Sequence, residues 1–317
     1  MRDAIERREA GLLTYGITPP KRSYAPDKRA RVAATQSARI RALPVDGLVV
    51  YDLQDESDRT SQERPFPFVQ TIDPVQYAYE DLREVTVPKV VYRCVAPLPE
   101  ASLTSSLQRI DEHGGLSVLV GAASREQSIV THLPEAYTLR KQRVATVPVG
   151  GVLIAERHDS RGGEDARVLR KMDHGCSFFI TQAVYSVVAS KNVLSDLHYQ
   201  AQRLGRPVPP ILVTLSPCGS TKTMEFMRWL GVSVPRWLDN ELTHAQDILQ
   251  TSIDLCADIL TDLVHFAREK NIPLGCNVES VSLRKAEIDA SVELVHRARA
   301  ILRGTHTVGQ PPGIVAP

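Results

Sequence analysis

The fold of this 317-residue chain is decided by the stretch Arg170-Lys171-Met172-Asp173-His174-Gly175-Cys176-Ser177-Phe178-Phe179-Ile180-Thr181-Gln182. Its basic residues end a helix, and Gly175 supplies the left-handed turn that follows. The apolar run after the turn predicts a buried parallel strand, which leads into a polar Thr-Gln pair. Such a pair is typical of the C-terminal end of a strand in a (β/α)8 barrel, the face at which these barrels bind ligands.

The rest of the chain repeats this alternation of short apolar runs and helical segments. Several runs are continuous in Val, Ile and Leu, as expected of parallel strands that are buried on both faces. We therefore predict an α/β fold, a single (β/α)8 TIM barrel over residues 1–303, followed by a flexible C-terminal tail over residues 304–317. A doubly wound sheet is the alternative, but the sequence lacks its Gly-x-Gly-x-x-Gly phosphate turn. The expected strands are Leu12–Thr18, Gly47–Asp52, Lys89–Val95, Leu116–Gly121, Val149–Ala155, Ser177–Gln182, Pro210–Leu215 and Pro273–Val278.

Two further segments carry clear local signals. Apolar residues at helical spacing predict one long helix from Leu242 to Lys270. The longest irregular segment runs from Leu53 to about Asp73, and it overhangs the barrel mouth because it follows the second strand. Its Phe66 and Phe68 either clamp an aromatic ligand or pack over the barrel rim, and the sequence leaves both readings open.

Composition excludes several classes of function. The net charge of +1 gives no field to attract nucleic acid or an anionic membrane, and no apolar run is long enough for a transmembrane helix. The charged N-terminus lacks the apolar core of a signal peptide. The five cysteines include no Cys-x-x-Cys pair, which favours a reduced cytoplasmic setting without a zinc site. We expect no metal, because acids such as those of Asp239-Asn240-Glu241 normally serve as caps and dipole partners at the start of a helix.

Six short segments form an ordered pattern along the chain. They are Thr14-Tyr15-Gly16-Ile17-Thr18-Pro19-Pro20, Asp58-Arg59-Thr60, Glu156-x-His158, Lys171, Thr181-Gln182 and Val232-Ser233-Val234-Pro235-Arg236-Trp237. Taken in order, they resemble the methylenetetrahydrofolate reductase family, and the resemblance covers the barrel from Leu12 to about Ile301.

The resemblance implies an oxidoreductase that uses NADH or NADPH to deliver a hydride to the methylene carbon of a reduced folate, its small-molecule substrate. Gln182 stands where the family holds the pterin, and we take Tyr185 and Asp52 as further substrate-binding candidates. The implied cofactor is FAD. His158 and Lys171 fall where the family contacts the flavin ring and phosphates, and Gly121 ends the fourth strand beside them.

The chain departs from the family at the residues that carry the chemistry. The family's general acid is a glutamate three residues before the first proline of strand one, and Gly16 occupies that place. Opening the folate ring needs a proton on the leaving nitrogen, and a positioned acid contributes about 10²–10⁴ in rate. Ala122 replaces an aspartate after strand four, while Val91 and Ile154 replace flavin contacts. Tight flavin binding is therefore not expected, and direct transfer from the nicotinamide stays open.

Two explanations of the missing acid stay open. A carboxylate from another strand end replaces it, with Asp52, Glu56, Glu156 and Glu279 as candidates. Glu279 is the first choice, because strand eight lies beside strand one in a closed barrel. Alternatively, the barrel serves another function, since a fold does not dictate a reaction. That function would be non-reducing folate binding, one-carbon transfer, or the conversion of another aromatic substrate.

Several candidate residues could instead have a purely structural role. Tyr185 opens a helix and could simply pack, while Lys171 suits the end of a helix dipole. The basic run from Lys21 to Arg41 holds seven cations against Asp27 alone. It either attracts a polyglutamate tail or a nucleotide phosphate, or forms the solvated face of an outer helix.

Overall fold

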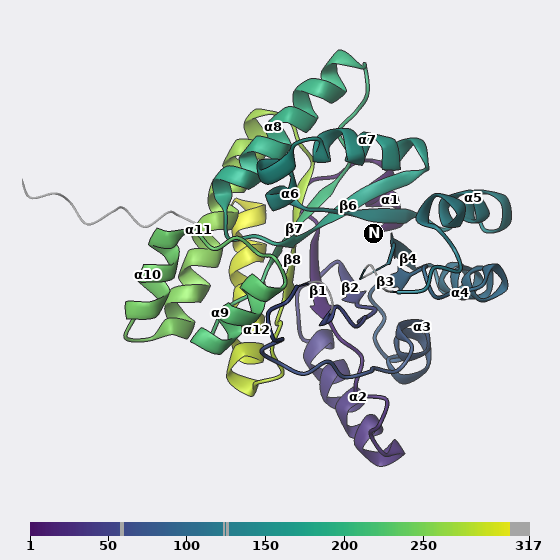
Figure 1. Ribbon diagram of the computed structural model, residues 1–317, viewed down its shortest axis with the longest axis horizontal. Coiled ribbons are helices and arrows are strands. Elements are labelled where there is room, and N and C mark those ends of the chain that lie inside the picture. Colours follow the sequence, from purple (N-terminus) through teal and green to yellow (C-terminus); the bar gives the residue numbers. More distant parts are fainter. Residues whose placement is uncertain (58–59, 123, 125–126, 305–317) are drawn as a thin grey trace, which may run out of the picture.

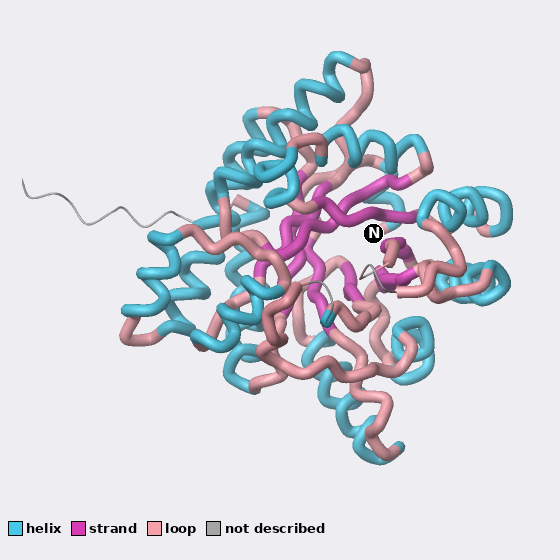
Figure 2. The backbone as a smooth tube through the Cα atoms, in the orientation of Figure 1, coloured by secondary structure: helices cyan, strands magenta, loops and turns pink. Residues whose placement is uncertain are grey.

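The computed structural model of the chain describes residues 1–57, 60–122, 124 and 127–304. Its eight parallel strands follow one another around a closed barrel, in which the last strand pairs with the first (Figures 1 and 2). The chain therefore has the single (β/α)8 barrel that the sequence predicts. The strands are β1 (Leu13–Ile17), β2 (Gly47–Val50), β3 (Lys89–Cys94), β4 (Leu116–Val120), β5 (Val149–Leu153), β6 (Cys176–Ala183), β7 (Ile211–Leu215) and β8 (Leu274–Glu279).

Helices surround the barrel on its outer side (Figure 2). They are α1 (Arg2–Glu6), α2 (Pro26–Arg41), α3 (Pro74–Gln76) with the π-helical turn η2 (Tyr77–Asp81), α4 (Glu100–Glu112), α5 (Leu133–Arg143), α6 (Ala155–Arg161), α7 (Glu164–Asp173), α8 (Val187–Arg203), α9 (Thr221–Trp229), α10 (Arg236–His244), α11 (Ile248–Glu269) and α12 (Lys285–Arg303). Apart from Gly304, the predicted C-terminal tail lies outside the described residues.

Strand alternation divides the apolar side chains into two cores. Successive residues of a strand point to opposite faces, so one set fills the barrel and the other meets the helices. The inner core includes Val49, Val90, Phe178, Ile180 and Leu212, and all five are fully buried. The much larger outer core lies between the strands and the helices.

The N-terminal helix α1 closes the bottom of the barrel. Ala4 and Ile5 belong to the inner core, and Ile5 is only 2% exposed. The Arg2 guanidinium donates to the carbonyl of Gly115, just before β4, at 2.6 and 3.1 Å. The helix therefore fills the face opposite the one at which these barrels bind ligands.

Of two local features that the sequence predicts, the structure confirms one and contradicts the other. Gly175 adopts the predicted left-handed conformation, with φ of 98°, between α7 and β6. The single helix predicted over Leu242–Lys270 is wrong, because the chain leaves the helical conformation between α10 and α11. Asp247 starts the second helix by accepting hydrogen bonds from the backbone N–H groups of Leu249 and Gln250, both at 3.0 Å. An aspartate in this role is an N-cap, and it interrupts an otherwise continuous apolar periodicity.

None of the described helices is long and apolar enough to cross a membrane. Within the same residues, no group of three or more His, Cys, Asp or Glu side chains is arranged to hold a metal ion. All five cysteines are buried and unpaired. Burial raises the pKa of the Cys176 thiol, so this side chain packs as a small neutral group.

Candidate functional site

A row of polar side chains crosses the interior of the barrel between β1, β8 and β7. Thr14 and Thr214 both lie opposite Asn277 in the strand register. The Thr14 hydroxyl donates to Asn277 Oδ1 at 2.8 Å, and Asn277 Nδ2 donates to Thr214 Oγ1 at 3.3 Å. All three residues are buried, so these bonds satisfy groups that could not reach water. The row forms a fixed polar floor beneath the mouth.

The next interior row toward the mouth joins Gly16 to Glu279. These two residues are register partners in the β1–β8 pair. A Cβ atom on residue 16 would lie 3.1 Å from the Glu279 Cβ and 2.9 Å from the Tyr51 ring. Only glycine leaves room here, so the absence of a side chain on β1 is what admits Tyr51 and Glu279 over this strand. A carboxyl group therefore lies beside the position at which the sequence lacks one.

Tyr51 links the Glu279 carboxyl to the polar floor. Its hydroxyl accepts a hydrogen bond from Asn277 Nδ2 at 2.9 Å and donates one to the Glu279 carboxylate. The Tyr51 ring also lies against Tyr92, with 4.8 Å between ring centroids. The glutamate is thus held by a neighbour that is itself fixed on two sides.

Burial controls the protonation of this pair. It raises the pKa of Glu279 to about 7, although the Tyr51 hydroxyl opposes the shift by stabilising the carboxylate. Burial, together with the charge of Glu279, also raises the pKa of Tyr51 well above its ordinary value. At neutral pH Tyr51 is therefore neutral and Glu279 exchanges its proton readily, which is the range in which a general acid works best.

Gln182 lies at the end of β6, where the strand pairing is irregular. The register of β6 with β7 shifts between Ile180 and Ala183, so β6 carries one extra residue there. Such bulges re-aim side chains near functional sites. Gln182 Nε2 donates to the carbonyl of Leu230 at 2.6 Å, while its Oε1 is buried and has no hydrogen-bond partner among the described residues. The side chain is anchored through its nitrogen and offers an unused acceptor.

Glu156 contacts the same segment as Gln182. Its carboxylate accepts a hydrogen bond from the backbone N–H of Ser233 at 3.4 Å, and burial raises its pKa. Leu230 and Ser233 belong to the connection between α9 and α10. Glu156 and Gln182 therefore hold this connection across the mouth between β5 and β6.

Three other predicted site residues point away from the mouth. Tyr185 is 1% exposed, and its hydroxyl donates to the carbonyl of Ser216 at 2.6 Å in the outer core. Lys171 lies on the helix-facing side of β5 and donates to the carbonyl of Val152 at 2.8 Å. His158 Nε2 lies 3.0 Å from the Asp196 carboxylate, between α6 and α8. These side chains do not meet Gln182 or Glu279.

The long segment after β2 packs onto α9. The Phe66 ring meets Phe226 edge to face, with 5.2 Å between centroids, and Trp229 Nε1 donates to the carbonyl of Gln62 at 3.0 Å. Arg64 lies over the Trp229 ring. Phe66 thus packs over the rim instead of standing free to clamp a ligand. The family-like residues Asp58 and Arg59 lie outside the described residues.

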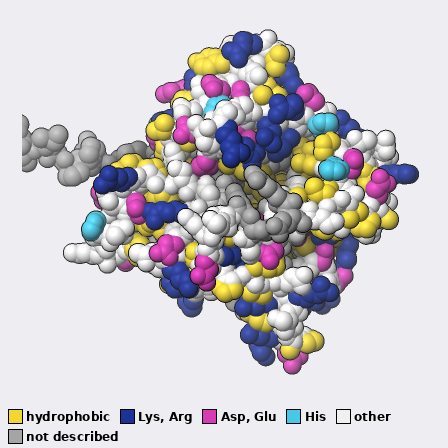
Figure 3. Space-filling view, viewed as in Figure 1, with side chains coloured by type: hydrophobic (Ala, Val, Ile, Leu, Met, Phe, Trp, Pro, Cys, Tyr) yellow, Lys and Arg dark blue, Asp and Glu magenta, His cyan; other side chains and the backbone are white. Residues whose placement is uncertain are grey.

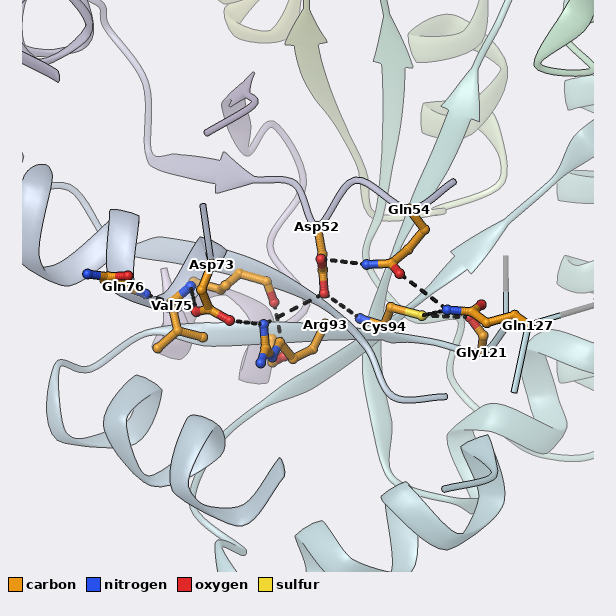
Figure 4. Close-up of polar contacts among 11 residues, drawn as sticks. Asp52, Gln54, Asp73, Val75, Gln76, Arg93, Cys94, Gly121 and Gln127 are labelled. Atoms are coloured by element: carbon orange, nitrogen blue, oxygen red, sulfur yellow. Dashed lines mark hydrogen bonds and ion pairs between the residues drawn. The ribbon is translucent and has the colours of Figure 1, made fainter. Parts of the chain in front are cut away.

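A second polar cluster lies on the rim, above β2 and β3 (Figure 4). Asp52 accepts hydrogen bonds from the Cys94 backbone N–H and from Gln54 Nε2, both at 2.8 Å. Arg93 donates to Asp73 at 2.6 Å and lies 3.7 Å from Asp52. Burial raises the pKa of Asp52, and the nearby Arg93 partly offsets this effect. The cluster lines a cleft of about 870 Å³.

The predicted candidates therefore separate into two places. Gln182, Glu279 and Glu156 border the central mouth, whereas Asp52 lines the rim cleft. Gly121 reaches the rim cluster only through its carbonyl, which accepts a hydrogen bond from the Cys94 thiol at 3.3 Å. Tyr51 and Arg93 were not predicted as site residues, although each lies at the C-terminal end of an apolar strand, where polar residues signal a site.

No family model matches the chain, and no curated protein matches it either. Among solved structures, an uncharacterized protein from Clostridium thermocellum that binds two copies of 5-methyl-5,6,7,8-tetrahydrofolic acid is 41% identical, with a TM-score of 0.83 over 95% of this chain and 99% of that one. A 2,3-dimethylmalate lyase of the PEP mutase/isocitrate lyase superfamily is 11% identical, with a TM-score of 0.44 and 93% of both chains covered. The 7,8-dihydropteroate synthase from Vibrio fischeri ES114 is 12% identical, with a TM-score of 0.45 and 96% of both chains covered.

Replacing Glu279 by Gln should change how stability depends on pH. The unfolded carboxyl titrates near its ordinary value of 4.5 and the folded one at about 7, so the folded state binds more protons between these values. The contribution of Glu279 is fully favourable below about pH 4.5 and is lost as the pH rises through 7. A shift of this size corresponds to roughly 3 kcal/mol in the free energy of unfolding.

Urea unfolding of the wild type and Glu279→Gln at about pH 5 and about pH 8.5 measures this effect. We expect the variant to gain stability relative to the wild type at the higher pH. Parallel pH dependences in the two proteins would show that Glu279 is ionised throughout.

Proposed function

The chain belongs to the same family as the Clostridium thermocellum protein, and from this premise we propose that it binds a reduced folate in the barrel mouth. The observation that carries the proposal is 41% identity over almost the whole of both chains, with a relative that binds 5-methyl-5,6,7,8-tetrahydrofolic acid. The mouth is chemically suited to such a ligand. It presents a few polar groups that are fixed by their neighbours, as small-molecule sites do.

The unused acceptor of Gln182 supports the position of the pteridine. A buried carbonyl oxygen without a partner costs about 1–3 kcal/mol, and a ligand N–H group would remove that penalty. The reduced pteridine carries such donors on its aminopyrimidinone edge. Because Gln182 Nε2 is held by the carbonyl of Leu230, its oxygen is already oriented before a ligand arrives. We infer that Gln182 orients the pteridine by accepting from this edge.

Cationic side chains suit the other end of a folate. The space-filling view shows Lys and Arg side chains gathered over α6 and α7 (Figure 3). The exposed cations of these helices include Arg161 and Arg167. These helices follow β5, on the side of the mouth to which Gln182 belongs. They offer a favourable field for the glutamate carboxylates of the ligand.

For the chemistry, we propose that the chain reduces a methylene-folate with NADH or NADPH. A hydride adds to the methylene carbon, the bond from that carbon to N10 breaks, and N10 takes up a proton. Glu279 is our candidate donor of this proton, because its pKa of about 7 leaves a large protonated fraction at neutral pH. Glu156, whose pKa burial also raises, is the second candidate.

The residues that the family resemblance assigns to flavin do not fit that cofactor here. Lys171 is engaged with the carbonyl of Val152 on the helix side of β5, and His158 is enclosed between α6 and α8. Neither side chain is directed toward the mouth. We therefore derive no step through flavin.

A second candidate function is folate binding without reduction, as in a carrier or a one-carbon transfer protein. The specific observation in its favour is that the relative binds the methyl form, which is the product of the reduction. A protein that keeps the methyl form needs no hydride donor. Turnover distinguishes this function from the reductase.

Replacing Gln182 by Ala should weaken binding of 5-methyltetrahydrofolate about tenfold to a hundredfold, because one hydrogen bond to a buried polar group is lost. Calorimetric titration measures the affinity directly. Gln202→Ala on the exposed face of α8 is the matched control and should leave the affinity unchanged. If the wild type binds no reduced folate, the proposal fails, and equal affinity in the two variants would remove Gln182 from the site.

Replacing Glu279 by Gln should lower kcat for anaerobic NADH or NADPH oxidation with methylenetetrahydrofolate by about 10²–10⁴, since the proton donor is lost. The assay follows methyltetrahydrofolate formation, with and without added FAD. Wild-type turnover without FAD would support direct hydride transfer. Binding without any turnover would favour the carrier function, and full activity in the variant would move the acid role to Glu156.

A further inference from the structure

The rim cleft is separate from the central mouth. Tyr51 and Tyr92 turn into the barrel, whereas the next residue on each chain segment, Asp52 and Arg93, lines the cleft. Its walls come from the segments that follow β2, β3 and β4, at the ligand-binding face of the barrel. Its volume of about 870 Å³ is within the usual range for sites that enclose a small organic ligand.

The buried end of the cleft contains a cation with unused hydrogen-bonding capacity. Arg93 is only 6% exposed, and its Nε is buried without a hydrogen-bond partner among the described residues. Its terminal nitrogen donates to Asp73 and lies near Asp52, so the charge is balanced although one donor is not satisfied. Buried donors in folded proteins are nearly always bonded. A ligand acceptor at this end of the cleft would complete the arrangement.

The lining also suits a ligand whose two ends differ. The lining includes three carboxylates and two arginines. It therefore favours a ligand that places its hydrogen-bond donors against the carboxylates. The amides of Gln54 and Gln127 supply both donors and acceptors beside Asp52 (Figure 4). Phe68 and Leu98 add apolar surface. The carboxylates are Asp52, Asp55 and Asp73, and the arginines are Arg22 and Arg93.

At the exposed end, Arg22 is available to an anion. Its backbone is fixed through a hydrogen bond from its N–H to the carbonyl of Gln70 at 2.9 Å. Its guanidinium is exposed and makes no ion pair or side-chain hydrogen bond within the described part of the chain. The neighbouring Arg29 is instead paired with Asp81. Arg22 is therefore a cation at the edge of the cleft that can receive a carboxylate.

We propose that the rim cleft is a second reduced-folate site. The aminopyrimidinone edge lies against Asp52 and the amides, a ring acceptor meets Arg93, and the glutamate tail pairs with Arg22. The inference rests on the proposed function, and the two molecules bound by the Clostridium thermocellum relative are consistent with one in the mouth and one in the cleft. The two sites are adjacent but share none of these side chains.

Calorimetric titration of the full chain with 5-methyltetrahydrofolate tests the assignment. We expect two molecules per chain, one weakened by Gln182→Ala and the other by Arg22→Ser. The loss at Arg22 should be about threefold to tenfold, as for a partly exposed ion pair. Gln70→Trp, which adds bulk at an exposed lining residue, should weaken the same site at least tenfold. Arg31→Ser and Gln202→Trp are the matched controls and should change neither site.

A second ligand identifies the group that Arg22 contacts. With 5-methyltetrahydropteroate, which lacks the glutamate, Arg22→Ser should bind as tightly as the wild type while Gln70→Trp still weakens the site. Two molecules unaffected by either cleft variant would overturn the assignment, and so would a single molecule that only Gln182→Ala weakens. In both cases the folate function would stand. Absence of any folate binding would instead remove the proposed function itself.

Discussion

The close approach of three strands at Gly16 determines the character of the mouth. Because residue 16 has no side chain, the Tyr51 ring and the Glu279 side chain lie directly over β1. Any larger residue would displace one of them. The hydrogen bonds from Asn277 to Tyr51 and from Tyr51 to Glu279 depend on this arrangement. A carboxyl group thereby becomes buried enough for its pKa to rise to about 7.

The contact at Gly16 also bears on the difference from the methylenetetrahydrofolate reductase pattern, which has a glutamate at this position. A side chain on residue 16 would meet both the Tyr51 ring and the Glu279 Cβ, so the glycine on strand one and the packing of Glu279 on strand eight are physically coupled in this chain. Restoring a glutamate at position 16 is not a simple repair, since its Cβ would lie within 2.9 Å of the Tyr51 ring.

The barrel could be predicted from the sequence because its signals are local. Eight apolar runs of strand length, separated by segments with helical periodicity, identify the strands. This identification does not depend on the direction in which each side chain points. The helix α1 could not be found in this way, since its charged sequence gives no periodicity and only the barrel's open bottom makes Ile5 buried. The interruption before α11 depends on a single capping side chain, Asp247, which the apolar pattern conceals.

Part of the candidate site could be predicted from the sequence for a similar reason. Strand ends are visible in the sequence, so Gln182, Glu279 and Asp52 could be assigned to the ligand-binding face. The direction of a side chain depends on its neighbours. Hence the outward positions of Lys171 and Tyr185, and the separation of Asp52 from the central mouth, required the structure. Arg93 also lies near a strand end, but its partners Asp52 and Asp73 come from other segments, and only the structure brings them beside it.

The protonation state of Glu279 is the most direct test of this account. Difference infrared spectroscopy of the wild type against Glu279→Gln isolates the carboxyl stretch of this one side chain. We predict a protonated carboxyl band at about pH 5 that disappears with a midpoint at about 7. A carboxylate signal that is already complete at about pH 5 would show that Glu279 is an ordinary ionised glutamate. That result would contradict the central role assigned to the contact at Gly16.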